Sequence, residues 1–132
     1  MLLSQACKYA IRAALYLAQH DEESLLSRDI AHALDIPEHF LAKVLQDLAR
    51  ARLLRSAKGR GGGFRLGRPA GDIKLVEIVQ AIEGVYFGDG CVLGLPECSD
   101  ENACPLHSQW SDVKTSILQM LEQKSLEELA AE

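Results

Sequence analysis

Three of the chain's four cysteines lie close to a histidine in the last third of the sequence. Cys91, Cys98 and Cys104 are separated by six and five residues, and His107 follows Cys104 after two more. Thiolates with an imidazole bind zinc, copper(I) or iron-sulfur clusters rather than Mg²⁺ or Ca²⁺. Zinc sites usually include a tight C-x2-C pair, which the sequence lacks. The spacing favours an iron-sulfur cluster, with a zinc site and free or disulfide-forming thiols as the alternatives.

Cys7 and its surroundings bear on the compartment and on the ligand set. Cys7 lies among small apolar residues and is expected to be packed, so it is only an outside candidate for a ligand. Lys8 and Arg12 interrupt the first apolar stretch, which argues against a signal peptide. The sequence has no run of 18 apolar residues, the length that a membrane-spanning helix needs. We therefore expect a cytoplasmic protein whose cysteines are not a structural disulfide framework.

Length, composition and charge narrow the class of protein. The 132 residues suit one domain, and with 48% hydrophobic and 25% charged residues the chain is expected to be globular. Aromatic residues are only 5%, which favours helices. The net charge of -5 conceals an asymmetry, because residues 43–68 hold eight basic residues against Asp47 alone. This basic patch can attract nucleic-acid phosphates although the whole protein is acidic.

Helical periodicity in the first 50 residues predicts three helices. The first spans 4–19, with Ser4 as N-cap and an apolar surface wide enough for more than one neighbour. A short helix capped by Ser27 ends at Asp35-Ile36-Pro37, and a second follows over 38–50. In that second helix the predicted inner face is Phe40, Leu41, Val44, Leu45 and Leu48, and the predicted outer face is His39, Ala42, Lys43, Gln46 and Asp47. This arrangement is typical of a helix-turn-helix.

A glycine-rich hairpin is predicted to follow. Residues 53–56 and 63–66 are short extended segments, and the loop between them carries Lys58 and Arg60. The glycines do not indicate a nucleotide-binding loop, because the chain returns into Phe64-Arg65-Leu66 rather than opening a helix with Lys-Ser/Thr. Helix-turn-helix and hairpin together predict a mainly α winged helix-turn-helix domain over residues 1–84.

The remainder is predicted to divide at residue 105. A helix over 73–84 ends at Gly84, and residues 85–104 form a long cysteine-rich loop. Residues 105–132 form a long helix and a short, acidic, frayed tail. The helix has an apolar stripe that predicts pairing with a second chain, although the stripe could fold back on its own core. The stripe consists of Leu106, Trp110, Val113, Ile117, Met120 and Leu121.

These motifs together resemble the BadM/Rrf-type winged-helix regulators, which include IscR-like and NsrR-like iron-sulfur regulators. The resemblance spans roughly residues 1–121 and is carried by Lys8-Tyr9-Ala10-Ile11-Arg12-Ala13, by the stretch from Arg55 to Pro69 with its Gly-Gly-Gly-Phe, and by the cysteine loop. It implies a homodimeric transcription factor whose long C-terminal helices cross and whose loops hold an iron-sulfur cluster near the partner chain's DNA-binding domain. In IscR-like members the ligands correspond to Cys91, Cys98, Cys104 and His107.

Two departures from the family pattern qualify the ligand set. The first cysteine gap is six residues where the relatives have five, which leaves the cluster type open. A [2Fe-2S] cluster is favoured and a [4Fe-4S] cluster is the alternative. Lys8 stands where the nitric oxide branch has an acidic ligand, which disfavours that mode of ligation.

The resulting prediction is a cytoplasmic DNA-binding transcriptional regulator, a repressor at palindromic operators, gated by the cluster and without enzymatic activity. No nucleophile or carboxylate dyad accompanies His20, His32 or His39 in the sequence. The expected DNA contacts are Arg28, His39, Lys43, Gln46, Lys58 and Arg60. The alternatives are a thiol-disulfide or zinc-responsive regulator on the same fold, and an iron-sulfur carrier or electron-transfer module, which would have no use for the basic wing.

Overall fold

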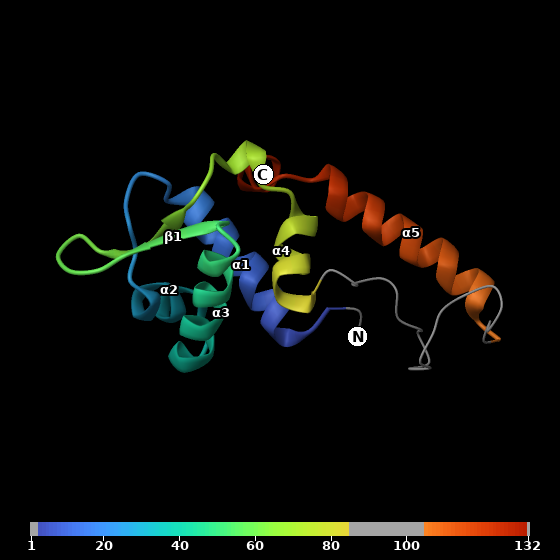
Figure 1. The fold of residues 1–132 in the computed structure, drawn as a ribbon, viewed down its shortest axis with the longest axis horizontal. Helices are drawn as coiled ribbons and strands as arrows, with labels where there is room; N and C mark the ends of the chain where they lie inside the picture. Colours follow the sequence, from blue (N-terminus) through green and yellow to red (C-terminus); the bar gives the residue numbers. More distant parts are fainter. Residues whose placement is uncertain (1–2, 85–104, 132) are drawn as a thin grey trace.

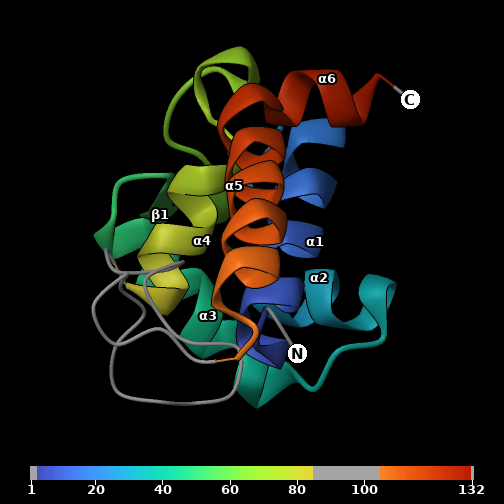
Figure 2. The same cartoon turned by 90° about the vertical axis from the view of Figure 1, so that its right-hand side faces the viewer.

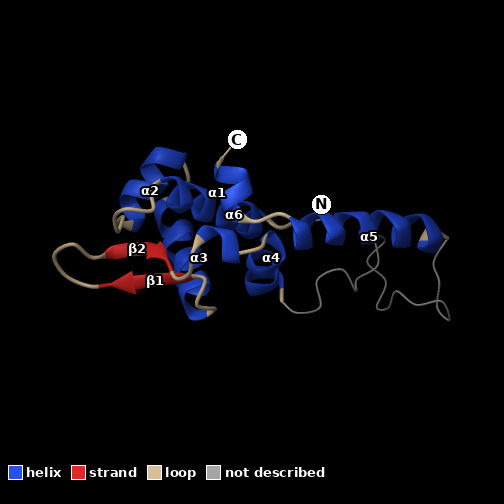
Figure 3. Ribbon diagram, turned by 90° about the horizontal axis from the view of Figure 1, so that it is seen from above, coloured by secondary structure: helices blue, strands red, loops and turns tan. Residues whose placement is uncertain are grey.

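The computed structural model describes residues 3–84 and 105–131, which form a mainly helical domain with one hairpin (Figure 1). The helices and strands follow each other as α1 (Gln5–Gln19), α2 (Ser27–Leu34), α3 (Glu38–Arg50), β1 (Leu54–Ala57), β2 (Gly63–Leu66), the 3-10 helix η1 (Ala70–Asp72), α4 (Leu75–Glu83), α5 (His107–Gln123) and α6 (Leu126–Ala130). The hairpin projects from one end and α5 from the other (Figure 3). The predicted winged-helix fold class is confirmed.

Helix α1 lies at the centre of the domain. Ser4 caps it as predicted, its hydroxyl accepting a hydrogen bond from the Cys7 N–H at 3.1 Å. The helix contacts α2, α3, α4, α6 and β2. Its buried positions are mostly small, so several neighbours can approach its backbone closely. They are Cys7, Ala10, Ala13, Ala14 and Leu17.

The tight turn between α2 and α3 is formed as the sequence indicated. Asp35 ends α2 in the left-handed region with φ 55°, and Pro37 precedes the first residue of α3. From α1, Arg12 donates to the carbonyl oxygen of Leu34 at 2.8 Å, which occupies a free acceptor at the end of α2. The two helices are thus held against α1 as one unit.

The wing, here the hairpin β1–β2 with its connecting loop, is antiparallel, with Leu54 opposite Leu66 and Ala57 opposite Gly63. Leu25 adds a bridge on the other edge of β2, exchanging two backbone hydrogen bonds with Phe64. Gly63 makes this approach feasible, because its φ is 125° and a Cβ there would lie 2.4 Å from the Leu25 carbonyl oxygen. Gly63 therefore allows the wing to pack against the loop that precedes α2.

The end of the chain differs from the predicted frayed tail. Leu126 is fully buried, and its backbone N–H donates to the Ile73 carbonyl oxygen at 3.0 Å. In return, the backbone N–H of Leu75 donates to the carbonyl oxygen of Lys124. Ser125 caps α6, which packs on α1 and η1 (Figure 2). The prediction was wrong because the anchor is a backbone pairing with residues 73–75, about 50 positions away in the sequence, which local composition does not reveal.

Candidate nucleic-acid interface

The predicted recognition helix is α3, and its inner face is nearly as expected. Leu41, Val44, Leu45 and Leu48 are buried. Phe40 was wrongly placed on that face, since it is 42% exposed and its ring meets Tyr9 edge-on, with centroids 5.3 Å apart. Phe40 precedes the buried Leu41 on the helix, so it lies at the margin of the apolar stripe rather than within it.

The polar residues predicted to contact DNA are all exposed. Arg28 lies in the first turn of α2, and His39, Lys43 and Gln46 lie on α3. Lys58 and Arg60 lie in the loop of the wing, in the described structure between β1 and β2. His20 and His32 are also exposed, and His20 Nδ1 lies 2.8 Å from the Tyr16 carbonyl oxygen, as expected for surface histidines.

A groove of about 480 Å³ joins three of these residues between the helix-turn-helix and the wing. Arg28, Gln46 and Lys58 line it from α2, α3 and the wing. The same groove is bordered by residues that we did not predict, among them Ser27, Glu38 and Ser56. Glu38 is an acceptor in an otherwise basic groove, and carboxylates accept hydrogen bonds from cytosine amino groups in the major groove. His39, Lys43 and Arg60 do not line the groove.

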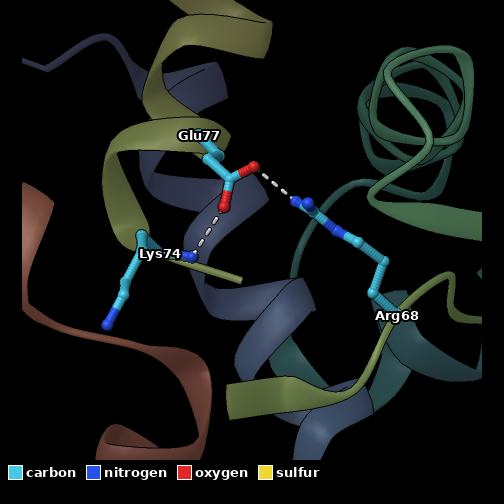
Figure 4. A network of polar contacts seen from close by, with 3 residues as sticks. All are labelled: Arg68, Lys74 and Glu77. Carbon is cyan, nitrogen blue, oxygen red and sulfur yellow. Dashed lines mark hydrogen bonds and ion pairs between the residues drawn. The ribbon is translucent and has the colours of Figure 1, made fainter. Parts of the chain in front are cut away.

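An ion pair fixes the base of the wing to α4. Just beyond β2, Arg68 donates to Glu77 Oε2 at 2.5 Å, while Glu77 Oε1 accepts from the Lys74 backbone N–H at 3.0 Å (Figure 4). Partial burial on its own would raise the pKa of Glu77, but these two hydrogen bonds and the charges of Arg68 and Lys74 outweigh it and lower that pKa below 4.5. The pair connects the wing to the helix that leads into residues 85–104.

Replacing Glu77 by Gln is expected to reduce stability at pH 7 by about 0.5–1 kcal/mol, because the pair is partly exposed. Since folding lowers this pKa, the carboxylate stabilises the protein fully above pH 4.5, and the contribution is lost as the pH falls through the folded value. Urea denaturation measures the free energy of unfolding of each protein. The difference in this free energy between wild type and Glu77→Gln should therefore become smaller from pH 7 to below pH 4. Glu122→Gln, at an exposed position, serves as the control. If wild type and Glu77→Gln differed by the same free energy of unfolding at both pH values, this account would be contradicted.

The predicted cluster ligands fall mostly outside the described residues. Cys91, Cys98 and Cys104 lie in 85–104, whereas His107 is the first residue of α5, at the end farthest from α6 (Figure 1). Cys7 is fully buried, and burial, with a smaller contribution from the charge of Glu83, raises the pKa of its thiol to about 11. A thiol so reluctant to ionise is a poor metal ligand. Among residues 3–84 and 105–131, no three His, Cys, Asp or Glu residues are grouped to hold a metal ion.

Helix α5 carries the predicted apolar stripe, and the structure divides it in two. Leu121 is buried, and Ile117 packs against the core of its own chain. Leu106, Val113 and Met120, spaced by seven residues, are 43%, 49% and 51% exposed. A seven-residue spacing brings side chains to one side of a helix and is typical of helix pairing. No helix in the described ranges is long and apolar enough to cross a bilayer.

A helix-turn-helix next to a β-hairpin with a basic loop defines a winged-helix DNA-binding protein. The chain belongs to the Rrf2 family, described as iron-dependent transcriptional regulators, whose model matches residues 3–132. It is a DNA-binding transcriptional regulator of that family.

Individual relatives agree with this family membership. IscR of Xenorhabdus nematophila, a helix-turn-helix transcriptional regulator, is 32% identical over 130 residues, covering 98% of this chain and 79% of its own. The structure of T. potens IscR superposes with a TM-score of 0.78 at 27% identity, covering 96% of this chain and 84% of that one. CymR, the global cysteine regulator of B. subtilis, has the same fold, with a TM-score of 0.81 at 24% identity and coverage of 98% and 95%.

Proposed function

We propose that this regulator is a homodimeric repressor that binds palindromic operators and is gated by an iron-sulfur cluster. The observation that carries the proposal is the combination of a basic winged-helix surface with the donors Cys91, Cys98, Cys104 and His107 in one short chain. The description of the family as iron-dependent supports the metal part of the proposal. Residues 1–84 would bind DNA, 85–104 would supply thiolates, and 105–132 would contain the dimerisation helix.

The DNA contacts are proposed from the exposed side chains described above. Lys43 and Gln46 have the length and the hydrogen-bonding groups to reach base edges in the major groove, with His39 near the start of the helix and Arg28 across the groove. Lys58 and Arg60 suit a narrow minor groove or its phosphates. Both elements can act on one duplex because the groove beside α3 extends to Lys58.

The dimer is proposed from the exposed part of α5. Leu106, Val113 and Met120 would lie in water on a projecting helix unless a second copy covered them. Two-fold symmetry is the commonest state of homo-oligomers, and a palindromic operator needs two recognition helices at a fixed separation. The first residue of this helix is His107, which is also a proposed cluster ligand.

The donor set suits the proposed cluster chemically. Three thiolates and one imidazole are soft ligands, and replacing a fourth thiolate by imidazole raises the reduction potential of a [2Fe-2S] centre. Cys7 adds no competing ligand, because it is buried with a raised pKa. When bound, the cluster would link these four residues, and the link would depend on the redox state and on the supply of iron.

The second candidate is a thiol-disulfide or zinc-responsive regulator on the same fold. Three cysteines within 14 residues could serve either chemistry, although the missing C-x2-C pair disfavours zinc. A brown protein with iron and acid-labile sulfide after anaerobic isolation would support the cluster. A colourless protein containing zinc, or containing no metal at all, would support the second candidate.

The DNA-binding part is tested at the loop of the wing. Replacing both Lys58 and Arg60 by Ala should weaken binding and flatten the slope of log affinity against log salt by about 0.9 for each phosphate that the variant no longer neutralises. The measurement is a gel-shift titration at several salt concentrations, with exposed Lys124→Gln as control. Unchanged affinity and salt slope would overturn the assignment of this loop to DNA.

A further inference from the structure

The wing and the segment that leads into it carry exposed arginines that no carboxylate of the described residues neutralises. Residues 48–71 contain seven basic residues and no acidic one. Arg50 and Arg68 are each paired with a carboxylate. In the described part of the chain, Arg52 and Arg55 make neither a side-chain hydrogen bond nor an ion pair. Two exposed guanidinium groups are therefore available to an external anion.

These two arginines line a second groove, of about 370 Å³, between the end of α3 and β1. The other lining residues are Ala49, Leu54, Ser56 and Gly67. Ser56 also lines the larger groove beside α3, so the two grooves adjoin along β1. Leu25 pairs with the outer edge of β2, whereas no described residue pairs with the outer edge of β1. A ligand that fills the first groove can continue past this edge.

A like-charged pair across the hairpin adds to the positive field. Arg55 lies directly opposite Arg65 in the register, and both are exposed. Like charges at facing positions repel each other and destabilise a hairpin. Arg65 donates to the backbone carbonyl of Asp21 at 3.3 Å, and within residues 3–84 and 105–131 no carboxylate pairs with either arginine. An anion held near both guanidinium groups would remove the repulsion.

We propose that Arg52 and Arg55, with Arg65 beside them, bind backbone phosphates of duplex DNA that flanks the operator half-site. The proposal rests on the proposed DNA-binding function and extends it beyond the recognition helix and the loop of the wing. Guanidinium groups suit phosphate because they donate two parallel hydrogen bonds. Duplex DNA is the occupant that fits, because the second groove continues the groove already assigned to it. These contacts fix position on DNA without reading sequence.

The test compares two duplexes that share one operator, selected by the wild-type protein from a random-sequence pool. One duplex is trimmed to the protected palindrome, and the other is extended by about 10 bp, one helical turn, on each side. For Arg52→Gln/Arg55→Gln, the salt slope of the dimer on the extended duplex should fall by about 3.6, or 0.9 for each of four phosphates, two for each subunit. On the trimmed duplex the variant should match wild type.

Two further variants separate the effect of charge from an effect on folding. Arg55→Lys keeps the charge and should retain the wild-type salt slope, whereas Lys124→Gln removes a charge far from the wing and should change nothing. The proposal would be overturned if the double variant lost the same amount of salt slope on both duplexes, or lost none on the extended duplex. So would unchanged DNA binding with new self-association of the double variant, since the arginines would then only protect an open sheet edge. If wild type selected no duplex, the proposed DNA-binding function itself would fail.

Discussion

Replacing any one of Cys91, Cys98 and Cys104 by Ala is expected to abolish the visible absorption of the protein and its metal-dependent regulation. A site assembled from separated thiolates binds its metal only when all of them are present. Because His107 begins α5, binding at the proposed site would bear directly on the proposed dimerisation helix. Iron, sulfide and absorption measured on anaerobically isolated protein give the result.

The histidine and the fourth cysteine provide graded controls. His107→Ala should weaken or alter the spectrum, and His107→Cys should keep a cluster at a lower potential because a further charged thiolate replaces a neutral ligand. Cys7→Ala removes a buried thiol whose raised pKa makes it a poor metal ligand, so this variant should keep the full visible absorption. If all three loop variants retained wild-type iron, sulfide and regulated DNA binding, the sensing hypothesis would be wrong and only the winged-helix function would remain.

Val113→Asp is expected to convert the protein from dimer to monomer. Val113 is 49% exposed in the isolated chain, so the substitution leaves the fold intact but places a carboxylate in the proposed seam. A cost of about 3 kcal/mol for each buried, unpaired carboxylate would raise the dissociation constant of the dimer by about four orders of magnitude, because the symmetric seam would hold two of them. Sedimentation velocity across a range of concentrations measures the change, and specific operator affinity should fall with it.

The choice of position matters for this test. Ile117→Asp, which the sequence pattern alone suggests, would also disturb the core against which Ile117 packs. Thr115 lies on the side of α5 opposite Val113 by the helical repeat and is exposed, so Thr115→Asp adds the same charge outside the seam. A Val113→Asp protein that sedimented as a dimer, like Thr115→Asp, would place the dimer contact elsewhere.

Features of this protein that depend on local signals could be predicted from the residues alone. The α2–α3 turn follows from Asp35 and Pro37, whose backbone preferences act over one or two residues. The buried face of α3 follows from the helical repeat, except at its edge, where Phe40 contacts Tyr9 instead. The ligand set Cys91, Cys98, Cys104 and His107 stays a prediction, which rests on residue types, on spacing and on the resemblance to IscR-like regulators.

Features that join distant segments could be seen only once the chain was folded. The burial of Leu126 depends on backbone pairing with residues 73–75, and the tie between wing and α4 depends on Arg68 meeting Glu77. The division of the α5 stripe into a packed Ile117 and an exposed Val113 depends on where the rest of the chain lies. Periodicity gives the face of a helix to which a residue belongs, because it is a property of one helix. Which neighbour covers that face is set by packing among elements far apart in the sequence.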